Sequence, residues 1–251
     1  MVNSQRYGSG FHRDGFLVVR KFLVGAELAE LRDHLERYIR DVVPGLPDSD
    51  AFYDDRSRPE TLKQLHRMTQ DPFFRGYVQD ASWKGLAETL LGEDATCESP
   101  EWFGKPPGTV HPTPPHQDNY YFNLAPANVL TIWLALDRVD DENGCLRYIS
   151  GSHLAGTRPH GASRVLGFSQ GITDYGPADE AAEVPVHLEP GDAVVHHGWT
   201  IHRADPNRST TRPRRAFAMV FKGRSCRRDE EGYRRYQEEL GQQLAQRKLN
   251  S

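Results

Sequence analysis

A series of short β-type segments in the second half of the chain is the feature that most constrains the fold. From about Thr96 onward, apolar and β-branched runs are separated by Gly, Pro, Asn and Asp. The clearest runs are VLTIWLALDRV, CLRYISGSH, EVPVHLEPGDAVVHH and RRAFAMVFKG. Short strands separated by turn residues are typical of an antiparallel double-sheet sandwich or barrel. We therefore expect a jelly-roll-like β core over about residues 96–222.

Helical patterns flank this core. In GAELAELRDHLERYIRDVV, the apolar side chains recur at the spacing of one helix face: Leu28, Leu31, Leu35, Tyr38 and Ile39. Further helical signal covers residues 61–68 and 73–91, with Gly92 as the stop. The charged tail predicts a closing helix over about residues 228–247. The expected layout is α+β and mainly β, with helical support over about residues 1–95.

Length and composition restrict the class of protein. The chain has 251 residues, a formal charge of −4 and a pI near 6.3. No repeat or linker marks a boundary, so we expect one domain over residues 1–251. The absence of an overall basic charge argues against binding to nucleic acid or an anionic membrane. No apolar seam indicates an interface, so monomer and homodimer both remain open.

Cysteine usage and hydropathy indicate the compartment. Cys97, Cys145 and Cys226 are widely separated and form no CxxC pair, which favours a reducing environment. The N-terminal residues contain no apolar leader, and no apolar run reaches the length of a membrane span. We therefore expect a cytoplasmic protein.

The segment TPPHQDNYYF, residues 113–122, places a histidine two residues before an aspartate. If the segment is a strand, residues i and i+2 project from the same face. His116 and Asp118 would then form half of a metal site or an ordinary polar rim. Iron(II) is commonly held by two histidines and one carboxylate, with positions left open opposite them. The segment GDAVVHHGWTIHRADPN offers His196, His197 and His202 as the third ligand.

A further predicted strand, RRAFAMVF, begins at Arg214, twelve residues after His202. A buried arginine can bind a carboxylate with two parallel hydrogen bonds, as the recognition of a 2-oxo-dicarboxylate requires. The order of these residues on successive β segments favours a metal site over a polar rim.

Four segments together resemble the phytanoyl-CoA dioxygenase family of iron(II)- and 2-oxoglutarate-dependent oxygenases. They are KPPG from Lys105, PPHQD, TIWLALDRVDDENGCLRYISGSH and GDAVVHHGWTIHRADPNRSTTRPRRAF. The resemblance covers about residues 15–221 and is most specific over residues 105–215. It implies a double-stranded β-helix, the jelly-roll fold that cupins also have.

The resemblance also implies roles for individual residues. Three residues would bind iron(II) and so form the catalytic centre: His116, Asp118 and His202. Arg214 would hold the distal carboxylate of 2-oxoglutarate, and Trp133 would line that pocket. Thr131 shares the strand face of Trp133 and is included as a co-substrate residue.

Two departures from the family pattern concern the co-substrate anchor. Many members carry a small hydroxyl residue two positions after the distal histidine, where this chain has Ala204. The arginine lies one position further along than the family pattern predicts, which makes Arg215 a rival to Arg214. Thr131 is the residue expected to compensate for the missing hydroxyl.

Four residues near these motifs are expected to contact the substrate: Lys105, Gln117, Tyr120 and His197. His197 is also a candidate hydrogen-bond partner beside the metal. His196 should face the opposite side of the strand and is expected to pack in the core.

The resemblance implies an enzyme that uses iron(II), 2-oxoglutarate and O2 to oxidise an unactivated C–H bond. Halogenating relatives lack the carboxylate that Asp118 supplies, so halogenation is not expected. We expect hydroxylation or oxidative cyclisation of a small polar metabolite or natural product, such as a glycosylated antibiotic in bacterial secondary metabolism. The alternatives are an acyl-CoA 2-hydroxylase of the phytanoyl-CoA type, a cupin-like metal dioxygenase without 2-oxoglutarate, and a non-catalytic binding module.

Overall fold

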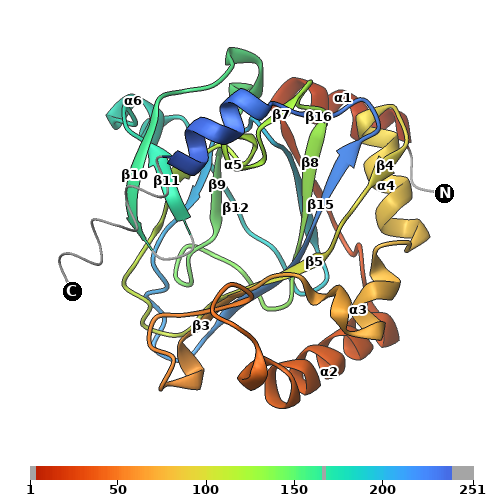
Figure 1. Ribbon diagram of the computed structural model, residues 1–251, viewed down its shortest axis with the longest axis vertical. Helices are drawn as coiled ribbons and strands as arrows, with labels where there is room; N and C mark the ends of the chain where they lie inside the picture. Colours follow the sequence, from red (N-terminus) through yellow and green to blue (C-terminus); the bar gives the residue numbers. More distant parts are fainter. Residues whose placement is uncertain (1–3, 166–167, 239–251) are drawn as a thin grey trace.

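Two facing antiparallel sheets form the centre of the molecule in the computed structural model, which describes residues 4–165 and 168–238 (Figure 1). The larger sheet contains eight strands in this part of the chain: β1 (Phe16–Val19), β2 (Ala51–Tyr53), β3 (Leu62–Leu65), β4 (Ala95–Thr96), β5 (Pro100–Lys105), β8 (Val129–Ala135), β13 (Ala193–His197) and β15 (Arg214–Gly223). The smaller sheet contains four: β6 (Thr113–His116), β9 (Leu146–Ile149), β12 (Glu183–Val186) and β14 (His202–Ala204).

The order of the strands confirms the expected fold class, a mainly β, jelly-roll-like core. The larger sheet runs β1-β13-β8-β15-β5-β3-β2, with β4 paired to β15, and the smaller runs β12-β9-β14-β6. Two further pairs join short strands: β7 (Leu124–Ala125) with β16 (Arg227–Arg228), and β10 (His160–Val165) with β11 (Phe168–Ile172).

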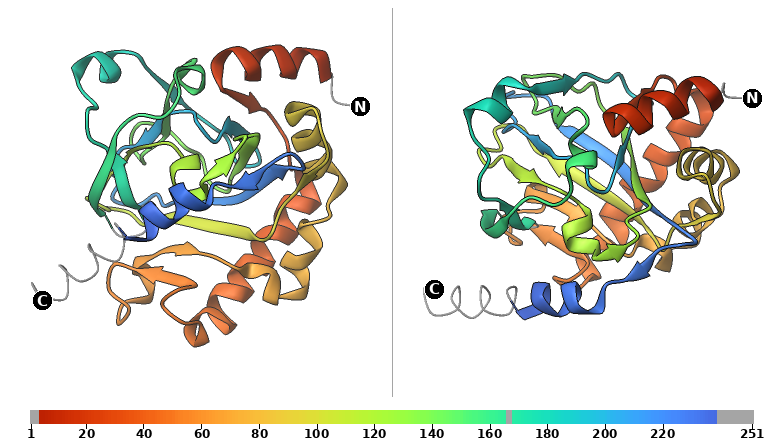
Figure 2. Two further views of the ribbon diagram at one scale, coloured as in Figure 1. Left: turned by 45° about the horizontal axis from the view of Figure 1, so that its top comes forward. Right: turned by 90° about the horizontal axis from the view of Figure 1, so that it is seen from above.

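Helices cover the outer side of the larger sheet, as the right-hand view of Figure 2 shows. The α-helices are α1 (Ser4–Asp14), α2 (Gly25–Asp41), α3 (Pro72–Tyr77), α4 (Ala81–Leu91), α5 (Asn119–Phe122) and α6 (Pro177–Ala181). Short 3-10 helices are η1 (Val43–Gly45), η2 (Pro59–Thr61), η3 (Met68–Gln70) and η4 (Ser152–Ala155). Within the described ranges, no helix combines the length and apolar character needed to cross a membrane.

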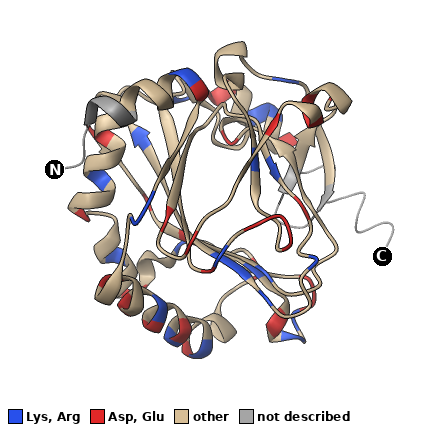
Figure 3. Cartoon of the chain, turned by 180° about the vertical axis from the view of Figure 1, so that it is seen from behind, with Lys and Arg blue, Asp and Glu red and all other residues tan. Residues whose placement is uncertain are grey.

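The amphipathic pattern of α2 explains its place on the sheet. Leu28, Leu31 and Leu35 are buried against the larger sheet, as the sequence predicts. Acidic and basic residues alternate along the rest of the helix (Figure 3). One apolar stripe with a charged opposite face is the pattern of a helix packed on a core from one side.

Strand β15 lies between two apolar cores, because its successive side chains point alternately into one and the other. Phe217 and Met219 pack in the cluster between the helices and the larger sheet. Ala216 and Ala218 belong to a second cluster between the two sheets. Because successive side chains of a strand point to opposite faces, the small alanines face the space between the sheets.

Two of the helical predictions need correction. Residues 61–68 were expected to be helical, but Leu62–Leu65 form β3, all four buried and paired between β2 and β5. Tertiary burial on both faces overrides the local preference here. The region 73–91 is two helices, because Asp80 caps a new helix by accepting hydrogen bonds from the Ser82 and Trp83 backbone N–H groups.

The ends of the predicted helices agree better with the structure. Gly92 terminates α4 with φ 71°, the left-handed conformation typical of a glycine stop. Residues 230–238 are helical and lie beside α5 (Figure 1). The remainder of the predicted closing helix lies outside the described residues.

Candidate metal centre and co-substrate pocket

A cavity of about 320 Å³ lies between the two sheets. Strands β3, β5, β8 and β15 supply one wall, and β6 and β14 supply the facing one. This volume is at the small end of the usual range for ligand pockets. The cavity is therefore sized for small molecules.

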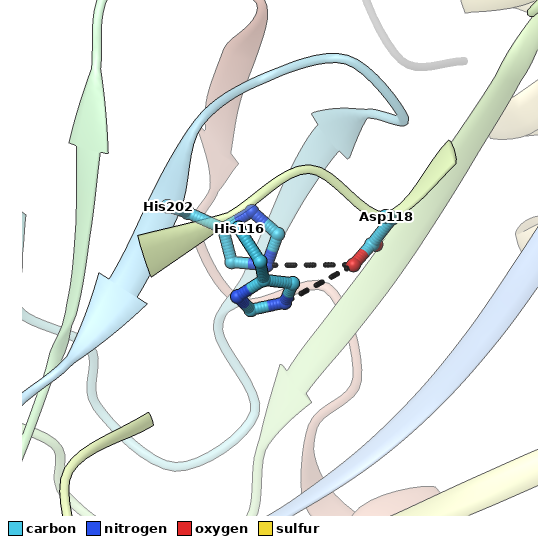
Figure 4. A group of neighbouring side chains, drawn as sticks. All are labelled: His116, Asp118 and His202. Carbon is cyan, nitrogen blue, oxygen red and sulfur yellow. Dashed lines mark ion pairs between the residues drawn. The ribbon is translucent and has the colours of Figure 1, made fainter. Parts of the chain in front are cut away.

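The side chains of His116, Asp118 and His202 converge (Figure 4), and all three line this cavity. The two histidines face each other in the register between β6 and β14. Their Nε2 atoms lie 3.4 Å and 3.6 Å from Oδ1 of Asp118. The three side chains thus present two imidazole nitrogens and one carboxylate oxygen to a common point, which is the donor set of a facial iron(II) site.

Asp118 reaches this point by a route that the sequence did not predict. Strand β6 ends at His116, and Asp118 has φ −56° and ψ −39° as the residue before α5. The condition considered in the sequence analysis, one strand that carries both His116 and Asp118 on one face, is therefore not met. A helical turn, held by the hydrogen bond from Tyr121 N–H to the Asp118 carbonyl, brings the carboxylate beside His116.

Backbone carbonyls set the tautomer of both histidines. The Nδ1 atom of His116 lies 2.8 Å from the Pro114 carbonyl, and that of His202 lies 3.0 Å from the Thr200 carbonyl. Since a carbonyl only accepts, each Nδ1 carries the proton and each lone pair lies on Nε2. Such partners orient histidines in metal sites.

The second oxygen of Asp118 is held by two other side chains. The Thr131 hydroxyl donates to Oδ2 at 2.9 Å, and Nε2 of His196 lies 3.0 Å from the same atom. His196 is itself held by the Tyr148 hydroxyl, 2.9 Å from its Nδ1. The carboxylate therefore has one oxygen fixed by the protein and the other directed at the two histidines.

His196 is the residue that sequence reasoning missed. We expected His196 to pack in the core and His197 to form the hydrogen bond beside the metal; the structure reverses these positions. His196 follows Val194 on the side of β13 that faces the space between the sheets, whereas His197 contacts Phe11 under α1. Which of two adjacent strand residues faces the space between the sheets depends on how the strand is paired. The two consecutive histidines His196 and His197 give no information about that pairing.

The electrostatics of the cluster match what a metal requires. Burial opposes the charge of Asp118, but His202, His116 and His196 outweigh it and hold the pKa of that carboxyl well below its usual value. Burial, followed by the neighbouring imidazoles of His116 and His196, lowers the pKa of His202 well below its usual value. An ionised carboxylate and a neutral imidazole are the forms that coordinate metals.

Arg214 lies in the same cavity as an isolated cation. Its side chain is 4% exposed, and its Cζ atom lies 5.4 Å from the centroid of the Trp133 ring. Its Nε has no hydrogen-bond partner among the described residues. Burial lowers the pKa of Arg214 to about 10, which leaves the guanidinium charged at neutral pH.

Lys105 is a second buried cation beside Arg214, which it opposes in the register between β5 and β15. Its Nζ donates to the Asp205 carbonyl at 2.6 Å and to the Ala204 carbonyl at 3.3 Å. Burial, and then the charge of Arg214, lowers the pKa of Lys105 well below its usual value. Ala204 therefore contributes its carbonyl here rather than a side-chain hydroxyl.

The two adjacent arginines have different surroundings in the structure. Arg215 points to the other face of β15 and pairs with both oxygens of Asp137, at 2.8 Å and 3.0 Å. Its charge is already matched, whereas that of Arg214 is not. Thr131 is also engaged, because its hydroxyl binds Asp118 instead of compensating near Arg214.

Three expected substrate residues lie outside the lining of the cavity. The Gln117 side chain is fully buried and hydrogen bonded to the backbone of Gly156, Trp199 and Arg158. The Tyr120 ring stacks on His160. Together with His197, these residues support the walls; of the four expected contacts, Lys105 alone is in the lining.

Comparison with known proteins places the chain in a family. The sequence model of the family "Phytanoyl-CoA dioxygenase (PhyH)" matches residues 11–216. The peroxisomal phytanoyl-CoA dioxygenase of Mus musculus is 26% identical over 234 residues, which cover 86% of this chain and 67% of that protein.

Two solved structures are similar in fold. EvdO2 from Micromonospora carbonacea var. aurantiaca, complexed with 2-oxoglutarate, is 26% identical with a TM-score of 0.71, covering 90% of this chain and 92% of that one. The epimerase SnoN, in complex with Fe3+, alpha ketoglutarate and nogalamycin RO, is 24% identical with a TM-score of 0.72, covering 89% and 84%. Since the family model spans most of its length, the chain belongs to the phytanoyl-CoA dioxygenase family of iron(II)- and 2-oxoglutarate-dependent oxygenases.

Proposed function

We propose that His116, Asp118 and His202 hold the iron and that Arg214 binds the distal carboxylate of 2-oxoglutarate. The observation that carries this proposal is the isolated guanidinium of Arg214 in the same cavity as the His-Asp-His cluster. A buried charge is costly unless it is paired. The pocket is therefore suited to an anionic ligand that reaches from Arg214 toward the cluster.

Lys105 supports the same assignment. Two buried cations side by side repel each other, and a carboxylate between them removes that repulsion. Lys105 is better placed to share the co-substrate carboxylate with Arg214 than to contact the primary substrate. This second cation would take the place of the hydroxyl that Ala204 lacks.

The bound cofactors would supply the oxidising power of the reaction, and the side chains of the protein would position them. When bound, iron(II) with 2-oxoglutarate and O2 supplies the oxidising power to break an unactivated C–H bond. Thr131 and His196 keep Asp118 in its orientation. Trp133 packs against the guanidinium of Arg214 and excludes water from the pair.

We infer that the substrate is a small polar metabolite or natural product, which the enzyme hydroxylates or oxidatively cyclises. The small cavity supports this inference. So do the fold relatives, one of which was solved with nogalamycin RO. A glycosylated antibiotic of bacterial secondary metabolism that enters the cavity with one of its rings would fit both observations.

A second candidate is 2-hydroxylation of an acyl-CoA, which the names of the curated relatives favour. Such a substrate combines a long apolar chain with several phosphate charges. It requires a longer apolar tunnel and a cationic mouth, which are the features to test against the first candidate.

The test is release of labelled succinate from isotopically labelled 2-oxoglutarate by protein reconstituted with iron(II) in air, with ascorbate as the reductant that consumes the second oxidising equivalent of O2. We expect release by the wild type and by Arg215→Met, and little or none by Arg214→Met. The two variants are matched, because they remove neighbouring arginines of the same strand. If the wild type bound iron but neither bound 2-oxoglutarate nor released succinate, a cupin-like dioxygenase without 2-oxoglutarate would be the better account.

A further inference from the structure

Three polar side chains line the cavity on the side away from the metal cluster, and the proposed reaction does not use them. We call Gln64, His66 and Glu101 the outer wall. They come from β3, the residue that follows it, and the neighbouring strand β5. Two of these side chains are more accessible than the inner end: His66 is 28% exposed and Glu101 is 26% exposed, against 4% for Arg214, whereas Gln64 is buried.

The outer wall is a connected hydrogen-bond network. Nδ1 of His66 lies 2.9 Å from Oε1 of Glu101, and its Nε2 lies 3.1 Å from Oε1 of Gln64. With Oε1 of Glu101 and Oε1 of Gln64 both placed as acceptors, both imidazole nitrogens donate, which is the arrangement of a protonated His66. The network therefore holds one positive and one negative charge that cancel.

The next charge along the wall is matched as well. Lys63 lines the cavity, but its ammonium is paired with Asp54. The outer wall therefore offers no unmatched cation within the described residues. Coenzyme A carries several phosphate charges, which proteins bind with clustered arginines and lysines. An acyl-CoA is thus a poor electrostatic match for this side of the cavity.

Two groups of the network point to a different ligand. Among the described residues, Glu101 and Gln64 each accept a hydrogen bond from His66 at Oε1, whereas Oε2 of Glu101 and Nε2 of Gln64 make none, so the wall retains one acceptor and one donor. A hydroxyl group both donates and accepts, and adjacent hydroxyls of one ring satisfy such a pair together. The Phe103 ring lies between Glu101 and Lys105 on the same strand face and supplies an apolar surface for the C–H face of a ring.

The spacing of the strands sets the size of this ligand. Trp133 of the inner end opposes Ala218, and Ala218 opposes Glu101 on the next strand. Two strand spacings correspond to about 10 Å. Thr131, which binds Asp118, lies two positions before Trp133 on the same face of β8, so the metal cluster is slightly further from Glu101 than this. A ligand with its reacting carbon at the metal cluster would reach the outer wall with one or two rings.

We propose that Gln64, His66 and Glu101 form the specificity subsite for a neutral, hydroxyl-rich ring of the substrate, of the sugar type. This inference rests on the proposed function, because it takes the inner end as the place of reaction. The outer wall then selects the substrate, and the inner end oxidises it.

The experiment is calorimetric titration, under anaerobic conditions, of the iron(II)–2-oxoglutarate complex and of the apoprotein. The probes are a panel of neutral aryl glycosides, including phenyl β-glucoside and phenyl α-rhamnoside, and decanoyl-CoA. We expect saturable binding of glycosides and none of decanoyl-CoA. Glu101→Gln and Gln64→Leu should each weaken glycoside binding by about tenfold, the value of one hydrogen bond to a charged or buried polar group.

Asp141→Asn is the matched control, because Asp141 forms a carboxylate–histidine pair with His187 outside the cavity, at 2.8 Å. It should leave glycoside binding unchanged. Iron and 2-oxoglutarate affinities should be unchanged in all three variants.

The results test the subsite proposal separately from the proposed function. Tighter binding of decanoyl-CoA than of glycosides, equal glycoside binding by Glu101→Gln and wild type, or no glycoside binding at all would overturn the subsite while iron and 2-oxoglutarate still bind. Failure of the wild type to bind 2-oxoglutarate would instead count against the proposed function. Glycoside binding to the apoprotein would still decide the subsite in that case.

Discussion

The two sides of the cavity differ in how their charges are matched. At the inner end, the Arg214 cation has no anionic partner in the described chain. Oδ1 of Asp118 faces the Nε2 atoms of His116 and His202. At the outer wall, the charge of His66 is paired with Glu101, and beside the wall the charge of Lys63 is paired with Asp54. Both regions line one cavity and are within a few strands of each other.

This difference separates two functions. Unmatched buried charge is unfavourable in the free protein and becomes favourable when an ion of opposite sign arrives. Matched polar groups cost little in the free protein and discriminate between ligands by hydrogen bonding. On the assignments proposed above, the inner end would bind the charged cofactors and the outer wall would recognise a neutral substrate.

The largest effect should come from removing a metal ligand. Asp118→Ala or His202→Ala should weaken iron(II) binding by more than about 100-fold, beyond the range for outer partners of a metal site. Iron binding can be measured by anaerobic equilibrium dialysis, with circular dichroism as the check on folding. An Asp118→Ala protein that retains full iron affinity would contradict the ligand assignment.

Replacing Arg214 should lower the affinity for 2-oxoglutarate without lowering the free energy of unfolding. Arg214→Met should weaken 2-oxoglutarate binding by about 30-fold or more, as the loss of a buried charge pair predicts. It should not destabilise the free protein, because it removes an unpaired buried charge. Arg215→Met should do the reverse, lowering the free energy of unfolding by about 1 kcal/mol with 2-oxoglutarate affinity unchanged.

These two variants can be compared by urea unfolding and by 2-oxoglutarate titration of the same preparations. Equal losses of 2-oxoglutarate affinity in both would show that the unmatched charge of Arg214 is not the anchor.

Replacing His196, the hydrogen-bond partner of Asp118, should have an intermediate effect on iron(II) affinity. His196→Phe removes the hydrogen bond to Oδ2 and should weaken iron(II) binding by about 10- to 100-fold, the usual cost of losing an outer partner. Tyr148→Phe, one step further from the carboxylate, should have a smaller effect. A His197→Phe control should leave iron affinity intact, since His197 lies on the other face of β13.

The smallest effect concerns the pH dependence of stability at the outer wall. Burial opposes the charge of His66, but Glu101 outweighs it, with Asp50 also favourable and Arg67 opposing, so the pKa of His66 is raised. The pair therefore contributes stability that is fully present below the unfolded pKa of about 6.5 and is lost as pH rises through the higher folded value.

Glu101→Gln should accordingly remove a contribution of less than about 1 kcal/mol at low pH and none at high pH. Urea unfolding of the wild type and the variant on both sides of this range measures the difference. An equal difference at both pH values would mean that His66 is not charged in the folded protein.

The sequence predicts the architecture well where the pattern is local. The β segments of the second half, α2 and the Gly92 stop all follow from periodicity and turn residues. Residues 61–68 were predicted wrongly, because β3 exists through its pairing with strands distant in sequence. The propensities of the residues in a segment do not indicate whether a strand distant in sequence pairs with it.

The candidate site was predictable in its residues but not in its geometry. Family motifs pointed to His116, Asp118 and His202, and the structure brings them together. The turn that positions Asp118 and the hydrogen bond from His196 depend on which face of each strand looks inward. The same holds for Arg214 and Arg215, whose opposite directions follow from the register of β15 with β5.

The outer wall could not be predicted because its members are far apart in the chain. Gln64 and His66 come from a segment that was expected to be helical, and Glu101 lies 35 residues beyond His66. Only the pairing of β3 with β5 makes them neighbours.

The most direct test of the central claim is an anaerobic titration of the apoprotein with iron(II) and then 2-oxoglutarate, followed by visible absorption. We expect a saturable metal-to-ligand charge-transfer band that is absent in His202→Ala, requires much more 2-oxoglutarate in Arg214→Met, and is unchanged in Arg215→Met. Iron binding without such a band, or a band that Arg214→Met leaves unchanged, would contradict the claim that the inner end holds iron and 2-oxoglutarate together.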